Sequence, residues 1–353
     1  MNEFSPIDVD ELLPQPGEAD FSQLLKVLRR EEPCRPVLFE FFLNDRLYEK
    51  LSGKKITPEM DWITYEQVRF AAYLRAGYDY VTVKVPGFEF PHGEQAHDAS
   101  VSQNEGAMIS DRASMEVYPW IAAEAARFDW LEELAQYLPP GMKMVIWGPG
   151  GVLENAISLV GYENLCLLIM DDPDFAMELF ANIGSRLERY YQLTAAYDFV
   201  GACISNDDWG FKTQTLFSPR AMRQFVFPWH RRIVEQIHAA GKPAILHSCG
   251  NFLKVLDDIV DDMQFDARHS YEDTIMPVEE AYEDHHHRLA ILGGIDVDFV
   301  CRAPIEAIEE RCRQMLARVT GRGGYALGTG NSVPAYVPDE GYFAMIRTAL
   351  QMR

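Results

Sequence analysis

Residues 218–250 read SPRAMRQFVFPWHRRIVEQIHAAGKPAILHSCG, in which a segment of helical length precedes an apolar run. Its first part, residues 218–240, has the length of a helix and carries Pro219 in its first turn, where proline suits an α-helix. The apolar run over residues 243–249 that follows is typical of a buried β-strand. The stretch therefore predicts one helix and one strand of a repeating βα fold.

The same alternation of apolar runs and helix-length segments repeats along most of the chain. A helical stretch, such as residues 304–319, follows each apolar run. The predicted strands are residues 37–42, 78–85, 142–148, 199–206, 243–249, 265–271, 289–297 and 324–330. Eight βα units predict an α/β fold of the (β/α)8 TIM-barrel type. An open doubly wound sheet is the weaker alternative, because the glycines near residues 148 and 328 do not complete a G-x-G-x-x-G fingerprint.

We expect a single barrel domain over residues 36–353, preceded by an acidic leader and a helix over residues 1–35. Residues 86–138 form a long polar and then helical insertion after the second predicted strand. Connections of this length are usually functional or disordered. We therefore predict that the insertion covers the substrate site.

Composition and charge limit the classes of partner. The chain has 353 residues, and 32 Lys and Arg against 54 Asp and Glu give a net charge of −22. This charge repels phosphate backbones and anionic headgroups, so we expect no binding to nucleic acid or to membranes. The sequence starts without the basic and apolar segments of a secretion signal, and it has no pair of cysteines in a C-x-x-C motif. We therefore expect a cytoplasmic protein with reduced cysteines.

Catalytic groups of such barrels lie at the C-terminal ends of the strands. The polar residues at the predicted strand ends therefore form a short set of candidates. They are Lys84, Glu89, Trp147, Asn206, Asp207, Asp208, Trp209, His247, Cys249, His269, Glu272, Asp296, Thr329 and Asn331. From this set we assign catalysis to Asp207, Asp208 and Glu272. We assign substrate binding to Asn206, Trp209, Trp147, Asp296 and Asn331.

His247 and Cys249 are the sharpest pair of candidates. Strand side chains alternate between the two faces, so residues two apart point the same way and could bind one cation such as zinc. Two ligands do not complete a zinc site, which needs three protein groups and an open position for catalysis. A buried histidine beside an inert cysteine is the alternative that these residues leave open.

Asp207 and Asp208 are adjacent carboxylates at a strand end. Their repulsion can raise one of the two pKa values into a range that suits acid–base catalysis. A helix cap beside a solvated turn explains the same two residues equally well.

Several segments resemble the uroporphyrinogen decarboxylase superfamily, which also contains zinc-dependent methyltransferases that move methyl groups between corrinoid proteins and thiols. The resemblance starts near Tyr65 and includes Phe225 and Pro228. The segments are ISNDDWG (204–210), FSP (217–219), HAAGK (238–242), HSCGN (247–251), GGID (293–296), GGY (323–325) and VPDE (337–340). The superfamily fold is an α/β barrel, which agrees with the eight βα units.

The resemblance is closer to the methyltransferase branch than to true uroporphyrinogen decarboxylases. The decarboxylases carry an arginine-rich loop for their anionic tetrapyrrole, whereas residues 39–46 contain only Arg46. Five acidic residues expected at the mouth would repel that substrate. They are Glu40, Asp45, Asp207, Asp208 and Glu272.

The methyltransferases bind zinc through a His-x-Cys motif, which His247 and Cys249 match here. Their third ligand, a cysteine near the end of the eighth strand, is missing, because residues 328–332 read GTGNS. The resemblance therefore implies either that an oxygen ligand such as Glu272 or Asp296 completes the site or that no zinc is held tightly.

The resemblance implies a metal-dependent methyltransferase with zinc as its cofactor, which moves a methyl group between a corrinoid protein and a small thiol or related substrate. Related barrels are often homodimers, so a homodimer is possible. Three alternatives stay open. One is a metal-free decarboxylase or lyase acting on a tetrapyrrole or a small carboxylate. Another is a phosphate-binding barrel enzyme that uses Gly293–Gly294 and residues 328–330. The third is a non-catalytic module that binds a corrinoid or tetrapyrrole.

Overall fold

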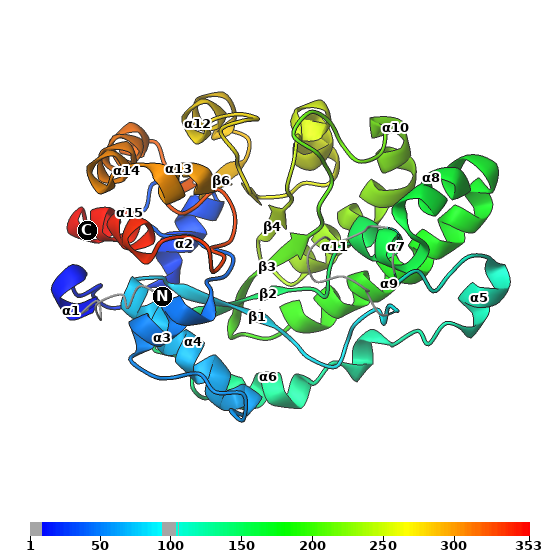
Figure 1. The fold of residues 1–353 in the computed structure, drawn as a ribbon, viewed down its shortest axis with the longest axis horizontal. Coiled ribbons are helices and arrows are strands. Elements are labelled where there is room, and N and C mark those ends of the chain that lie inside the picture. Colours follow the sequence, from blue (N-terminus) through cyan, green and yellow to red (C-terminus); the bar gives the residue numbers. More distant parts are fainter. Residues whose placement is uncertain (1–8, 94–103, 105) are drawn as a thin grey trace. The chain divides into compact units, whose positions relative to one another are not determined.

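The computed structural model describes residues 9–93, 104 and 106–353 (Figure 1). The first eight residues of the expected leader, and residues 94–103 and 105 of the expected insertion, lie outside the described residues. The chain forms two compact units. The first unit contains the described residues of Met1–Val83 with Trp130–Val145 and Asp266–Arg353, and the second contains those of Lys84–Asp129 with Ile146–Phe265.

The described residues contain seven strands. They are β1 (Tyr80–Lys84), β2 (Lys143–Trp147), β3 (Val200–Asn206), β4 (Ala244–His247), β5 (Ala267–His269), β6 (Ala290–Leu292) and β7 (Tyr325–Ala326). In the second unit β3 pairs with β4 in parallel, and in the first unit β5, β6 and β7 pair in parallel. Each strand lies within a predicted one, so the α/β prediction is confirmed for these seven.

The first predicted strand, residues 37–42, is not a continuous strand, and the expectation of eight regular strands is corrected. This segment makes only isolated parallel bridges, Leu38 with Leu327 and Leu43 with Val333. The Glu40 N–H donates to the Tyr80 hydroxyl over 2.7 Å, and the same hydroxyl donates to the Glu40 carbonyl over 2.6 Å. Because both backbone groups of Glu40 bond to a side chain, the ladder with the neighbouring segment is interrupted.

Helices fill the segments between the strands. In the first unit they are α1 (Val9–Leu12), α2 (Phe21–Leu28), α3 (Asp45–Ser52), α4 (Trp62–Ala76), α12 (Val278–His285), α13 (Val297–Arg302), α14 (Ile305–Val319) and α15 (Asp339–Gln351). In the second unit they are α5 (Arg112–Val117), η1 (Ala123–Ala125), α7 (Val152–Val160), α8 (Tyr162–Asp171), α9 (Pro173–Ala195), α10 (Pro219–Ala221), η2 (Met222–Val226), α11 (Phe227–Ala239), η3 (Leu253–Val255) and η4 (Asp258–Asp262). The remaining helix, α6, spans Phe128–Ala135.

No single helix in the described part of the chain has the length and apolarity needed to cross a bilayer. Helices α7 and α8 meet these requirements only when taken together, and they are bent by 99°.

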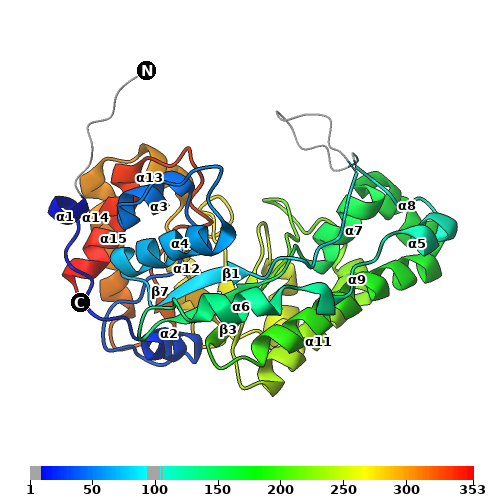
Figure 2. The same ribbon diagram turned by 90° about the horizontal axis from the view of Figure 1, so that it is seen from below.

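The helix predicted over residues 218–240 is present as α10, η2 and α11. Ser218 caps its start by accepting the Ala221 N–H, and Pro219 occupies the first turn. The turn at η2 is wider than an α-helical turn, with the Phe227 N–H donating to the Met222 carbonyl. Pro228, the next residue, has no N–H to continue the regular ladder, which explains this local change. Figure 2 shows α11 beside the long helix α9, and the Phe180 and Phe225 rings stack between α9 and η2 with centroids 5.6 Å apart.

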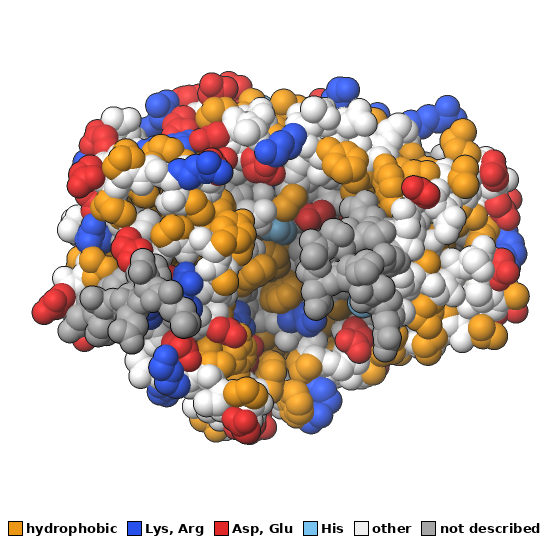
Figure 3. Space-filling model, in the orientation of Figure 1, with side chains coloured by type: hydrophobic (Ala, Val, Ile, Leu, Met, Phe, Trp, Pro, Cys, Tyr) orange, Lys and Arg blue, Asp and Glu red, His pale blue; other side chains and the backbone are white. Residues whose placement is uncertain are grey.

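Charged side chains on the surface are largely paired. Arg311 bonds to both Asp273 and Glu279 in the first unit, and Arg223 bonds to Asp258 in the second. On the face seen in Figure 3, acidic and basic side chains are interspersed. The net charge of −22 is therefore not concentrated in one patch on this face.

Glu40 is a fully buried carboxyl group in the first unit. Its Oε1 accepts the Thr329 N–H over 2.6 Å, and its Oε2 lies 2.8 Å from the Thr329 hydroxyl, which also bonds to the Asn331 carbonyl. A hydroxyl has one proton, so donation to Asn331 is satisfied best when Glu40 is itself protonated and donates to Thr329. Burial raises the pKa of Glu40 to about 8, which agrees with this arrangement.

We expect Glu40 to make the stability of the protein depend on pH. Its folded pKa of about 8 lies above the ordinary value of 4.5, so the stabilisation is complete below about pH 4.5 and is lost as the pH rises through 8. Between pH 5 and pH 8, the free energy of unfolding of the wild type should therefore fall by a few kcal/mol more than that of Glu40→Gln, measured by urea denaturation. The exposed Glu59→Gln serves as the control and should follow the wild type. Equal pH slopes for Glu40→Gln and the wild type would contradict the assignment.

Candidate metal centre

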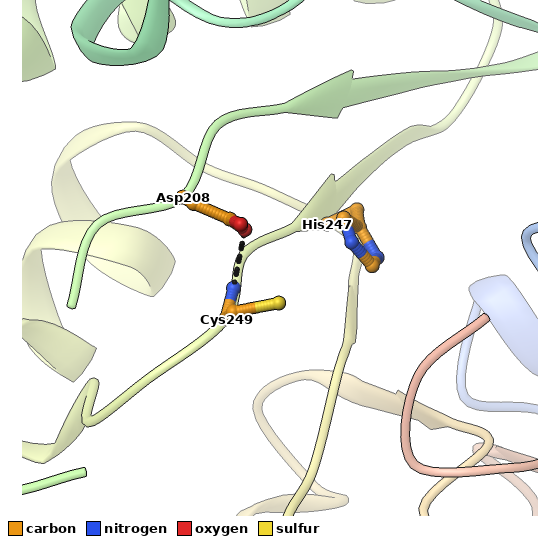
Figure 4. Close-up of side chains that lie close together, drawn as sticks. All are labelled: Asp208, His247 and Cys249. Carbon is orange, nitrogen blue, oxygen red and sulfur yellow. Dashed lines mark hydrogen bonds between the residues drawn. The ribbon is translucent and has the colours of Figure 1, made fainter. Parts of the chain in front are cut away.

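Three side chains with metal-binding atoms lie together in the second unit. Asp208 follows β3, His247 ends β4, and Cys249 comes two residues later. Each residue offers one ligand atom, and the three atoms lie within 4.8 Å of one another. They are a carboxylate oxygen, an imidazole nitrogen and the cysteine sulfur. Figure 4 shows the Asp208 carboxylate and the Cys249 sulfur extending toward the side on which His247 lies. His247 is 7% exposed, and the other two residues are half-buried.

Hydrogen bonds between the two loops fix this arrangement. The Cys249 N–H donates to Asp208 Oδ1 over 2.9 Å, the dashed line in Figure 4. The Asp207 N–H donates to the His247 carbonyl over 2.9 Å. Gly250 has a φ of +87°, and a Cβ on it would lie 2.2 Å from the Gly210 carbonyl oxygen. The close approach of the two loops therefore depends on glycine at position 250.

The donor set fits zinc. Zinc binds imidazole nitrogen, thiolate sulfur and carboxylate oxygen, and catalytic zinc sites have three protein ligands with one position left open. The oxygen donor beside His247 and Cys249 is Asp208, a residue that the sequence suggested for catalysis. Asp296, one of the two oxygen ligands considered from the sequence, instead caps α13. Its Oδ1 accepts the N–H groups of Asp298 and Phe299, and its Oδ2 accepts that of Asp273.

Asp207 has a different environment from its neighbour Asp208. It is 0% exposed, and its carboxylate accepts the N–H groups of Leu153 and Glu154 at the start of α7 over 2.9 to 3.1 Å. His230 Nε2 lies 2.8 Å from its Oδ2, and His230 Nδ1 lies 3.0 Å from the Ser205 hydroxyl. A carboxylate at a helix N-terminus is stabilised by the unpaired amides and the helix dipole. Asp207 thus caps the start of α7. This role corresponds to the helix-cap alternative that the sequence left open for Asp207 and Asp208.

Glu154 is a residue that sequence reasoning missed. Its Oε2 accepts the Gly151 N–H over 2.9 Å. Burial, together with the nearby charges of Asp207 and Asp208, raises its pKa to about 8. Glu154 stands three residues after the N-cap Gly151 and accepts its N–H, which is one half of a capping box, and this spacing was the available signal. A carboxyl group with this pKa can exchange a proton near neutral pH.

Comparison with known proteins identifies the family. Residues 125–352 match the family described as uroporphyrinogen decarboxylase (URO-D), and this match spans well over half of the chain. The chain belongs to the uroporphyrinogen decarboxylase family. The resemblance deduced from the sequence motifs is thereby confirmed.

Two methyltransferases are similar to this member of the uroporphyrinogen decarboxylase family. The methylated-thiol–coenzyme M methyltransferase of Methanosarcina mazei is 29% identical over 181 residues, which are 50% of this chain and 46% of that protein. The matched region thus spans less than half of that relative. A solved structure of a methyltransferase from Methanosarcina mazei has a TM-score of 0.67 at 15% identity and covers 95% of this chain and 99% of that one. This second likeness establishes the shared fold.

The second unit of this uroporphyrinogen decarboxylase family member also contains a cavity of about 540 Å³. We call it the Lys84 pocket, and its lining includes Lys84, Glu89, His92, Trp147 and Glu154. The ammonium of Lys84 lies 5.6 Å from the centroid of the Trp147 ring. Trp147, which was expected to bind substrate, therefore lines a cavity large enough for a small ligand.

Asn206 and Trp209, the other predicted residues beside β3, differ in their surroundings. Asn206 is opposite His247 in the parallel pairing, so the two side chains share one face of the sheet. Its buried Oδ1 has no hydrogen-bond partner among the described residues. Trp209 is 2% exposed and packs against Phe227 and His230, with ring centroids 5.0 Å away, so it belongs to the core of the second unit.

The remaining predicted residues lie in the first unit. Glu272 and Asn331 are half-buried, and Asn331 Oδ1 accepts the Ser332 N–H over 2.8 Å. Four of the five backbone amides suggested for phosphate binding already have partners within the protein. Thr329 donates to Glu40, Gly330 to the Ile295 carbonyl, Gly293 to the Ala326 carbonyl and Gly294 to the Thr329 carbonyl. This geometry does not support the phosphate-binding alternative.

The acidic mouth expected from the sequence is also smaller than predicted. Glu40 and Asp207 are both 0% exposed, and each carboxyl group is bonded to backbone amides. These two residues therefore cannot repel a substrate by lining an open site. Asp207 stands between Asn206 and Asp208, which resemble a loop, so its burial was not visible in the sequence. Glu40 lies between Phe39 and Phe41 in an apolar run, and this was the available signal of its burial.

Proposed function

We propose that this chain is a zinc-dependent methyltransferase that moves a methyl group between a corrinoid protein and a small thiol. The grouping of Asp208, His247 and Cys249, with ligand atoms within 4.8 Å of one another, carries the proposal. The similarity to a methylated-thiol–coenzyme M methyltransferase supports the choice of reaction. The corrinoid partner is proposed from the superfamily resemblance.

Asp208, His247 and Cys249 would hold the zinc. When bound, zinc lowers the pKa of a substrate thiol and so supplies a thiolate nucleophile near neutral pH. The protein contributes the orientation of the ligands, because the Cys249 N–H fixes the Asp208 carboxylate before any ligand binds. Asn206, which shares the face of His247, offers a buried oxygen that can accept a hydrogen bond from substrate.

The substrate itself is proposed to occupy the Lys84 pocket beside Trp147. The predicted roles of Glu272 in catalysis and of Asn331 in substrate binding stay predictions, and both are half-buried polar residues of the first unit. Asp207, Trp209 and Asp296 are given structural roles instead, because their side chains cap helices or pack in the core.

Metal analysis combined with a transfer assay tests the proposal. Purified protein should contain about one zinc per chain, and it should transfer methyl groups from methylcobalamin to coenzyme M. A chelator should abolish this transfer, and added zinc should restore it. Protein without metal, or transfer that persists in the chelator, would contradict the zinc mechanism.

The same purified protein can be assayed to distinguish the other two candidate functions. A decarboxylase or lyase predicts release of carbon dioxide that resists chelators. A non-catalytic module predicts a change in the cobalamin spectrum without turnover.

A further inference from the structure

We propose that Lys84 binds the single anionic group of a small organic ligand in the Lys84 pocket. The ligand class is a short carboxylate, sulfonate or phosphate monoanion with an apolar or sulfur-containing body. The inference rests on the proposed function in one respect, since it takes this ligand to be the methyl-accepting substrate. Lys84 ends β1, is half-buried, and lines the cavity together with Trp147.

Lys84 has no ion-pair partner among the described residues, although 54 acidic residues outnumber 32 basic ones. Two other lysines of the chain show the ion pairs that an excess of carboxylates allows. Lys50 lies 2.5 Å from Asp339, and Lys55 lies 2.9 Å from Glu49. In so acidic a protein, a half-buried ammonium without a carboxylate beside it requires an explanation.

The lining of the pocket does not neutralise Lys84. The pocket contains two carboxyl groups, Glu89 and Glu154, and neither forms an ion pair with it. Glu154 is bonded to the Gly151 N–H, and Glu89 is exposed. Lys84 therefore lines the cavity without an ion pair to the described residues, and the Trp147 ring, whose centroid lies 5.6 Å from the amine, provides a favourable contact.

The size and surface of the cavity define the ligand. A volume of about 540 Å³ suits a small molecule, and Phe90 and Trp147 supply apolar surface for its body. One ammonium matches one anionic group. A tetrapyrrole with many carboxylates would leave most of its charges without a partner, so a ligand with a single anionic group is favoured.

The test compares two thiols of similar size, anionic 2-mercaptoethanesulfonate and neutral 2-mercaptoethanol, by titration calorimetry on the purified protein as isolated. Lys84→Met should weaken binding of the sulfonate about 10- to 100-fold and change binding of the neutral thiol less than 3-fold. Lys84→Arg should retain most of the affinity, because it keeps the charge. The exposed Lys212→Met, in the same unit, should leave both affinities unchanged.

Equal effects of Lys84→Met on the two thiols, or no effect on either, would overturn the proposal. Parallel titrations with 3-mercaptopropionate and inorganic phosphate identify which anion class is bound. Because binding is measured directly, charge-selective binding without methyl transfer would reject the proposed function and keep this inference. Methyl transfer with equal affinity for the charged and the neutral thiol would support the proposed function and reject this inference.

Discussion

Replacing Cys249 with alanine is expected to reduce bound zinc from about one per chain to a small fraction and to lower methyl transfer by more than about 100-fold. The sulfur is one of three donors within 4.8 Å of one another, and no other cysteine belongs to this group among the described residues. His247→Ala should have a similar effect, because it removes the imidazole donor. Metal analysis measures the loss directly.

Cobalt substitution gives a readout that does not depend on activity. Cobalt bound by the wild type should show the absorption of a thiolate ligand, and Cys249→Ala should lack that absorption. Cys166→Ala is the matched control, since Cys166 is another half-buried cysteine of the second unit that forms no disulfide. An unchanged metal content in Cys249→Ala, or an equal loss in Cys166→Ala, would remove Cys249 from the centre.

Alanine substitutions at the adjacent residues Asp207 and Asp208 are expected to affect different properties, which are stability for Asp207 and zinc affinity for Asp208. Asp207→Ala should lower the free energy of unfolding by about 3 to 5 kcal/mol, because it leaves the buried His230 and two amides of α7 without their acceptor. Asp208→Ala should cost less than about 1 kcal/mol, because its half-buried carboxylate accepts only the Cys249 N–H among the hydrogen bonds described for it. Its zinc affinity should instead fall at least about 10-fold.

Urea denaturation in the presence of a chelator measures stability without a contribution from bound metal, and competition with a zinc dye measures affinity. Asp207→Asn is the informative control, since it keeps the shape and one oxygen acceptor and should lose less stability than Asp207→Ala. If the two alanine variants had the same profile in both measurements, the separation of an anchoring aspartate from a metal-binding one would be wrong.

The sequence predicted the strands more accurately than it predicted the roles of the side chains at their ends. Seven strands lie inside the predicted apolar runs, because burial in a parallel sheet demands such runs. The run over residues 37–42 has the same composition, yet its ladder is broken by the Tyr80 hydroxyl bonded to Glu40. That contact joins residues 40 positions apart, so no local pattern could have indicated it.

Alternation along a strand was sufficient to pair His247 with Cys249 as candidates. It did not identify Asp208 as the oxygen donor beside them, because the loop after β3 is positioned by bonds to the loop after β4. Asp207 and Asp208 have the same chemistry in sequence, and only His230 and the start of α7 distinguish them. Glu154 was missed because a glutamate near a helix start is usually a simple cap.

The close contact at Gly210 and Gly250 has a consequence for protein engineering. A side-chain carbon at position 250 would lie 2.2 Å from the Gly210 oxygen, so the two loops cannot be redesigned independently. A chimera that takes only one of these loops from another family member would place together two loop backbones that did not evolve in contact with each other. Exchanges intended to alter metal preference should therefore transplant residues 206–210 and 247–251 as one cassette.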